Sequence, residues 1–141
     1  MKKPYIVDQK VHSDDRGFFL PLTNNIDIQI KRVYVCGNYG RDVIRGFHYH
    51  KKEIKLFNII RGSAKFICIN PDDPSKIFTF VLSERTPAIL IIPPGYANGW
   101  MSLDDNTLLI GMSNATLEES IDDDIRYDPL KWGNVWEVKG R

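Results

Sequence analysis

Residues 53–70 read EIKLFNIIRGSAKFICIN, and this stretch decides the fold class. Two runs rich in β-branched and aromatic residues, 53–60 and 63–70, flank Arg61-Gly62, a pair typical of a hairpin turn. The same alternation of short apolar runs and Gly- or Pro-containing turns continues on both sides. It predicts further strands at 28–36, 42–50, 77–82, 88–92 and 107–112.

Helical periodicity is weak, and only the acidic stretch 117–125 is suited to one short turn of helix. Many short strands without helices predict an all-β, antiparallel sandwich or barrel, and such folds bind small ligands in the mouth or interior. The 141 residues suit one domain over 1–141. We divide it into an N-terminal arm with strands at 1–27, a barrel core at 28–115 and a C-terminal segment at 116–141.

Composition excludes several classes of function. Nineteen basic residues against eighteen acidic ones give a net charge of +1, so no broad basic face for nucleic acid is expected. The longest apolar run, 88–92, is far shorter than the ~20 residues of a membrane-spanning helix. The N-terminus has no apolar run typical of a signal peptide, which predicts a cytoplasmic protein. Cys36 and Cys68 are expected to be buried, reduced thiols.

The segment 45–55, RGFHYHKKEIK, carries the candidate chemistry. His48 and His50 are two residues apart on a predicted strand and therefore share a face, which alternation also assigns to Ile44. An apolar neighbour indicates the interior, where burial keeps imidazoles neutral and available as bases. Lys55 lies five residues beyond His50, past a point where the strand can bend, so alternation does not assign its side chain to a face. The alternative is a solvent-exposed pair beside Lys51 and Lys52.

A metal site is the other alternative for these residues. His48, His50 and Glu53 are the residue types of a first-row metal triad, but the third histidine, His12, lies far away in the sequence. We expect no metal. The acidic run 122–124 is predicted to be an exposed loop rather than a cation site.

Five motifs occur in a register that resembles a known family. They are Asp15-Arg16-Gly17-Phe18-Phe19, Arg45-Gly46-Phe47-His48-Tyr49, Lys55 seven residues before Gly62, Pro93-Pro94-Gly95-Tyr96-Ala97-Asn98-Gly99-Trp100, and Arg126-Tyr127-Asp128-Pro129. Over roughly residues 14–132 the chain resembles the dTDP-4-dehydrorhamnose 3,5-epimerases, which are cupins. The Arg-Gly-x-His-x-His pattern of 45–50 also resembles the related sugar-nucleotide 3,4-ketoisomerases.

The resemblance implies a cupin jelly-roll barrel (a double-stranded β-helix) and a homodimer that exchanges N-terminal strands. It implies a dTDP-linked 4-keto-6-deoxyhexose as substrate, no metal or redox cofactor, and a place in deoxysugar synthesis for a surface polysaccharide. The residue roles that follow are a general base at His48, a second proton carrier at His50, a cation beside the ketone oxygen at Lys55, and substrate contacts from Arg45, Arg16, Phe19, Tyr96 and Asn98.

The residue types suit this chemistry, because a ketone at C4 acidifies the protons at C3 and C5 and a neutral histidine can remove one of them. The chain also departs from the epimerase pattern. Ile110 stands where the family has its acid tyrosine, Asn98 replaces a histidine, and Pro21 replaces a glutamate. The segment carrying the aspartate partner of the base is expected to be absent. Tyr39, Tyr49 and Tyr96 are the alternative acids.

Three hypotheses follow, and we favour an epimerase slightly. A 3,4-ketoisomerase is the first alternative, because His50 replaces the glutamine usual in epimerases. A non-catalytic cupin that binds a sugar nucleotide is the second.

Overall fold

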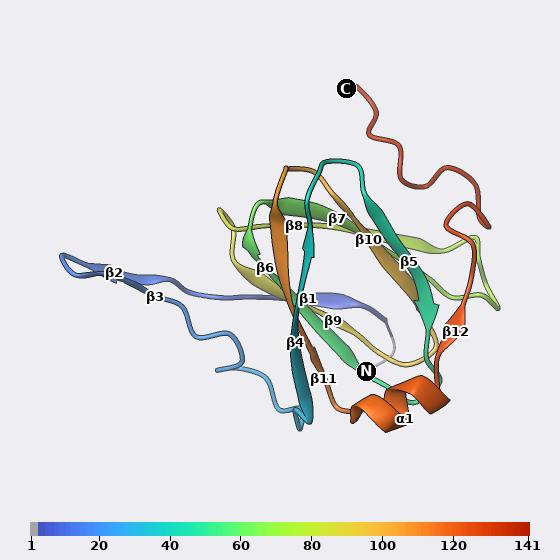
Figure 1. Cartoon of the computed structure of the whole chain (residues 1–141), viewed down its shortest axis with the longest axis horizontal. Coiled ribbons are helices and arrows are strands. Elements are labelled where there is room, and N and C mark those ends of the chain that lie inside the picture. The colour runs from blue at the N-terminus through green and yellow to red at the C-terminus, as the bar shows by residue number, and fades with distance from the viewer. Residues whose placement is uncertain (1–2) are drawn as a thin grey trace.

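The computed structural model describes residues 3–141. Within them, ten strands form two antiparallel five-stranded sheets, and two more form a separate hairpin (Figure 1). The first sheet has the order β1 (Tyr5–Asp8), β9 (Ala88–Ile92), β6 (Lys55–Arg61), β11 (Thr107–Ser113), β4 (Arg32–Asn38). The second has the order β12 (Ile125–Arg126), β5 (Ile44–Tyr49), β10 (Ala97–Ser102), β7 (Ser63–Ile69), β8 (Ile77–Ser83). The hairpin is β2 (His12–Asp14) with β3 (Gly17–Phe19).

The predicted all-β, antiparallel class is confirmed, but the turn at Arg61-Gly62 was assigned wrongly. Strand β6 pairs with β11 and β9, whereas β7 pairs with β10 and β8, so the turn carries the chain from one sheet to the other. Gly62 has φ +85°, and a Cβ added to it would lie 2.7 Å from Thr107 Oγ1. The site therefore needs glycine for both its conformation and its space.

The sequence predicts no strand between 88–92 and 107–112, but the structure has one there, β10. Pro93, Pro94 and Gly95 (φ +90°) make the turn, and β10 begins at Ala97. The strand was missed because Asn98 and Gly99 are weak strand formers. Gly99 is required here, since a Cβ on it would lie 2.7 Å from the carbonyl oxygen of Arg45.

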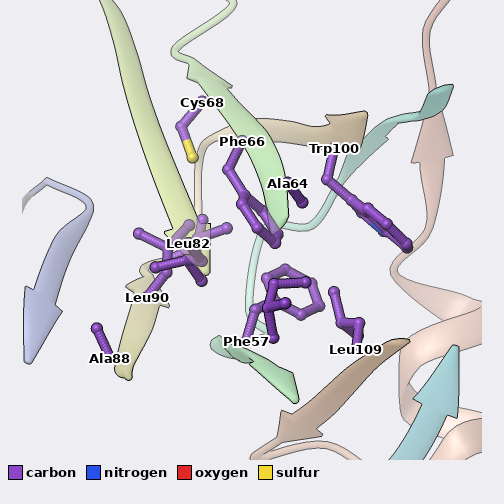
Figure 2. Packing of buried hydrophobic residues seen from close by; sticks show 11 residues of the cluster. Phe57, Ala64, Phe66, Cys68, Leu82, Ala88, Leu90, Trp100 and Leu109 are labelled. Atoms are coloured by element: carbon purple, nitrogen blue, oxygen red, sulfur yellow. The ribbon is translucent and has the colours of Figure 1, made fainter. Parts of the chain in front are cut away.

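Apolar side chains fill one end of the space between the two sheets (Figure 2). Phe57 stacks on Phe66 at 5.6 Å between ring centroids, and Phe66 stacks on Trp100 at 6.2 Å. Cys68 lies in this core and is fully buried, Cys36 is half-buried beside it, and both thiols are free. The predicted burial is confirmed for Cys68 and is only partial for Cys36.

The chain ends cover part of the outer face of each sheet. Ile26, Ile28 and Ile30, which precede β4, pack on the outer side of the first sheet, around the buried Leu56. Trp136 of the C-terminal segment is buried against Phe47 on the outer side of the second sheet. Strands such as β9 are thus buried on both faces, which explains why they read as continuous apolar runs.

Helix α1 (Leu117–Asp122) confirms the short helical turn expected from the sequence. Thr116 caps it: its side chain accepts a hydrogen bond from the Glu119 N–H, and Glu119 Oε1 accepts one from the Thr116 N–H. Among residues 3–141 there is no helix with the length and apolarity needed to cross a membrane.

Candidate active site

A cavity of about 550 Å³ opens between the two sheets at the end of the core beside α1. The first sheet contributes side chains from β4, β6 and β11, and the second contributes them from β5 and β10. The polar residues among its lining are Arg32, Tyr34, Cys36, Arg45, His48, His50, Lys55, Asn98, Ser120, Asp124 and Arg126. His48, His50, Lys55, Arg45 and Asn98, all predicted from the sequence, therefore meet in one cavity.

A bulge in β5 brings Arg45 to the same side as the histidines. Asn98 pairs with His48 but Trp100 pairs with Arg45, so β5 has one residue more than β10 between these positions. The extra residue reverses the alternation. Ile44, which the sequence placed beside the histidines, instead packs with the outer cluster, and that part of the prediction was wrong.

His48 is held by an aspartate from the C-terminal segment. Its Nδ1 lies 3.3 Å from Asp124 Oδ1, so Nδ1–H can donate to the carboxylate and leave the Nε2 lone pair available. Burial, and next the charge of Lys55, lower the pKa of His48, although Asp124 opposes them. The imidazole is therefore neutral near pH 7, as a general base requires.

Asp124 was the main residue that the sequence interpretation missed. The run 122–124 was assigned to an exposed loop, but Asp123 and Asp124 are half-buried. Asp123 accepts hydrogen bonds from the backbone N–H groups of Lys51, Lys52 and Glu53 at 2.8–3.2 Å, which fixes the loop after the histidines. The expected absence of an aspartate partner for the base was wrong. The Arg126-Tyr127-Asp128-Pro129 motif begins two residues after Asp124 and was the sequence feature that could have pointed to this segment as part of the site.

His50 is 4% exposed and uses a second carboxylate. Its Nε2 lies 3.0 Å from Glu53 Oε2 and 3.5 Å from Asp124 Oδ1. Burial, and then Lys55, lower its pKa. Its other nitrogen, Nδ1, is buried without a hydrogen-bond partner among the described residues. A neutral His50 that donates from Nε2 thus keeps a free lone pair on Nδ1.

Glu53 is a buried hub that fixes this arrangement. It accepts hydrogen bonds from Arg32 at 2.9 Å, Ser113 at 2.6 Å and Ser120 at 2.7 Å. Burial alone would raise the pKa of its carboxyl group, but these hydroxyl groups and the nearby charges of Lys55 and His50 lower it. Glu53 is therefore a carboxylate that accepts from His50.

Lys55 lies at the start of β6, on the sheet facing the histidines. Burial, and next the charge of Arg32, lower the pKa of its ammonium group, and Glu53 and Asp124 oppose that shift. A desolvated cation of this kind can stabilise an oxygen that becomes negative, because its charge is poorly screened.

Arg45 of β5 also lines the cavity. Its Nε donates to Asn38 Oδ1 at 2.7 Å and its Nη2 donates to the Gly37 carbonyl at 3.1 Å, so the guanidinium is held in place. Asn98 Nδ2 donates to the His48 carbonyl at 3.2 Å and ties β10 to β5.

Three residues predicted to contact substrate lie elsewhere in the subunit. Arg16 and Phe19 are on the β2–β3 hairpin, which extends away from the two sheets (Figure 1). Tyr96 packs edge-on against Phe78, with 5.9 Å between ring centroids. Ile110, aligned with the family's acid tyrosine, packs with the outer cluster of the first sheet.

Among residues 3–141, no group of three or more His, Cys, Asp or Glu side chains is arranged to hold a metal ion. Carboxylates instead engage one nitrogen of each histidine, Nδ1 of His48 and Nε2 of His50.

Comparisons with known proteins show the family and the fold of the chain. The spore coat polysaccharide biosynthesis protein SpsL of Bacillus subtilis is 31% identical over 106 residues, covering 70% of this chain and 70% of that one. The crystal structure of dTDP-4-dehydrorhamnose 3,5-epimerase from Bacillus anthracis with TDP and PPi bound has a TM-score of 0.80 at 21% identity, covering 97% of this chain and 86% of that one.

A variant of the 3,4-ketoisomerase QdtA from Thermoanaerobacterium thermosaccharolyticum, in complex with TDP-4-keto-6-deoxyglucose, has a TM-score of 0.76 at 23% identity, covering 90% of this chain and 89% of that one. These likenesses confirm the cupin-type fold. The family model for dTDP-4-dehydrorhamnose 3,5-epimerase matches residues 1–139. This chain therefore belongs to the dTDP-4-dehydrorhamnose 3,5-epimerase family, a family of sugar-nucleotide isomerases.

Proposed function

We propose that this protein removes a proton from the carbon beside the ketone of a dTDP-linked 4-keto-6-deoxyhexose and epimerises that carbon. The observation that carries the proposal is the pairing of His48 with Asp124 in a cavity that Lys55 also lines. A neutral base, the carboxylate that orients it and a cation for the developing charge are the three groups that enolisation needs.

The proton balance is simple. The His48 Nε2 lone pair takes a proton from C3 or C5, and the electron pair of the C–H bond moves into the ring to form an enolate. Lys55 stabilises the negative oxygen at C4, while Asp124 stabilises the imidazolium. Return of a proton to carbon on the opposite face completes epimerisation.

Arginines suit the diphosphate of such a substrate. Arg45 and Arg126 both line the cavity, and Arg45 is already oriented by Asn38. A guanidinium offers paired donors to phosphate oxygens and stays charged at every physiological pH.

The N-terminal hairpin supports a homodimer in which each arm reaches the partner's site. Phe18 is 77% exposed and Phe19 68% exposed, and β2 pairs only with β3 among the described residues. An isolated two-stranded hairpin is marginally stable in water, so a second subunit is needed to cover it. Arg16 and Phe19 would then contact a nucleotide in the partner's cavity.

A second candidate function is 3,4-ketoisomerisation, and the buried His50 favours it. The Nδ1 of His50 has no hydrogen-bond partner among the described residues, and His48 and His50 both line the cavity from β5 and the loop that follows it. Moving the carbonyl from C4 to C3 needs protons carried between C3 and the C4 oxygen through an enediol, which two neighbouring imidazoles can perform.

Incubation with dTDP-4-keto-6-deoxyglucose in D2O tests the proposal, with NMR locating the deuterium and identifying the product. We expect deuterium at C3 or C5 and an epimerised product, and a decrease of about 10²- to 10⁴-fold in His48→Asn. A 4-hydroxy-3-keto product lost equally in His48→Asn and His50→Asn would establish the ketoisomerase instead. Tight binding without exchange would show a non-catalytic binding module.

A further inference from the structure

Strand β11 offers no acid to the cavity at its inward-facing positions. Leu109 lines the cavity, whereas Ile110 packs on the outer face of the sheet. The next inward-facing residue is Gly111, where strand alternation would place a side chain between the sheets. Epimerisation nevertheless requires a proton donor on the face of the sugar away from the base.

Tyr34 of the neighbouring strand fills the space above Gly111. The two residues are direct partners in the β4–β11 ladder. A Cβ added to Gly111 would lie 2.3 Å from Tyr34 Cζ and 2.6 Å from its hydroxyl oxygen. The backbone of Gly111 is outside the left-handed region, so space, not conformation, explains the glycine.

The phenol and the base lie on opposite walls. Tyr34 projects from β4 of the first sheet and lines the cavity, while His48 projects from β5 of the second sheet and lines the same cavity. A pyranose ring held between the sheets would present one face to each. Arg32, whose Cζ lies 5.5 Å from the centre of the Tyr34 ring, supplies a nearby positive charge.

We propose that Tyr34 is the proton donor that completes epimerisation, and that Gly111 makes room for it. The inference rests on the proposed function. His48 takes the proton from one face, and the Tyr34 hydroxyl gives its proton to the same carbon from the other face. The tyrosinate then regains a proton from water and the imidazolium releases one, so the cycle is balanced.

Burial raises the pKa of Tyr34 to about 12, although the positive charge of Arg32 opposes the shift. The hydroxyl is therefore protonated at neutral pH and always ready to donate. Arg32 compensates by stabilising the tyrosinate that forms after the transfer.

The test separates proton removal from inversion. In D2O, Tyr34→Phe should still incorporate deuterium at C3 or C5 at a rate within a few-fold of the wild type, with retained configuration. Formation of the inverted product should fall about 10²-fold or more. Tyr39, one of the alternative acids expected from the sequence, is 94% exposed and outside the cavity lining, so it cannot serve as the acid in this cavity. Tyr39→Phe is therefore the matched control.

Circular dichroism and thermal unfolding verify that each variant folds. Normal inversion by Tyr34→Phe would overturn the proposal for Tyr34 alone, as would an equal loss of exchange and inversion. Absence of exchange in the wild-type enzyme would instead overturn the proposed function.

A second variant relocates the phenol. In Tyr34→Ala/Gly111→Tyr the phenol moves from β4 to the directly paired position on β11. This double variant should recover part of the inversion that Tyr34→Ala loses. A folded double variant that exchanges deuterium but inverts no better than Tyr34→Ala would count against a donor role.

Discussion

Asp124 links the two histidines of β5. Its Oδ1 lies 3.3 Å from His48 Nδ1 and 3.5 Å from His50 Nε2, while its Oδ2 accepts from Arg126 Nε at 2.9 Å. Burial alone would raise the pKa of Asp124, but the hydrogen bonds from Arg126 and His48 and the charges of both histidines together lower it, so this residue is a carboxylate at neutral pH. Its charge favours the protonated form of both imidazoles.

We expect Asp124→Asn to slow substrate deuterium exchange and to move its pH dependence. His48 acts as a base only when neutral, so the rate rises with pH through the pKa of His48, which already lies below 6.5. Removal of the carboxylate lowers that pKa further, so the acidic limb should move to lower pH. The plateau should fall about 10²-fold, because the imidazole loses its orienting partner.

Exchange rates measured from pH 4.5 to 8 check this expectation. Asp122→Asn, in the same acidic run but exposed, is the control and should match the wild type. An unchanged acidic limb in Asp124→Asn would contradict the assigned role of Asp124.

Glu53 contributes to stability as well as to the site. Glu53→Gln replaces a buried carboxylate that accepts from Arg32, Ser113 and Ser120, and we expect a loss of about 2–3 kcal/mol in the free energy of unfolding at pH 7. The pKa of Glu53 is lower in the folded chain than its ordinary value of 4.5. This contribution is therefore complete above that value and is lost as pH falls through the lower, folded pKa.

Urea unfolding at pH 7 and at pH 3.5 measures the effect, with the exposed Glu137→Gln as control. The difference between wild type and Glu53→Gln should shrink at the lower pH. A difference that is equal at both values would show that the charge of Glu53 has no such role.

At the scale of elements, the sequence predicts strands well because their apolar runs are local properties. The sequence fails to predict the side on which a side chain lies where the pairing of two strands decides it. The bulge in β5 appears only when the strand is laid against β10, and it places Arg45 in the cavity and Ile44 outside it. Asp124 was missed for a similar reason, since 76 residues separate it from His48.

Helix α1 positions the aspartates that serve β5, so its cap should affect the site. Thr116→Ala removes the side-chain oxygen that accepts from the Glu119 N–H, which costs about 1 kcal/mol. We expect the melting temperature to fall by about 3 °C. Differential scanning calorimetry measures it, and Thr116→Ser, which keeps the oxygen, should retain most of the stability. Equal losses in the two variants would rule out the cap as the cause.

At the scale of the molecule, the two sheets and the cavity are properties of one chain, but the β2–β3 hairpin is not packed against that chain's own core (Figure 1). The hairpin carries Arg16 and Phe19, two of the residues predicted from the sequence to contact substrate. Sequence resemblance identified them, although their distance from the cavity can only be seen in the structure. In the proposed homodimer, the arm of a second copy would complete each site.

Subunit complementation tests this arrangement. Arg16→Ala/Phe19→Ala removes the arm's contacts but keeps His48, whereas His48→Asn keeps the arm, and each homodimer should be inactive. Co-expressed with different tags, the two chains should form a heterodimer in which one site combines an intact cavity with an intact arm. Its activity should be about half that of the wild-type dimer. The control is Arg16→Ala/Phe19→Ala co-expressed with both tags and purified in the same way, because none of its dimers has an intact arm. A heterodimer as inactive as its parents, or a chain that light scattering shows to be monomeric, would place Arg16 and Phe19 outside any shared site.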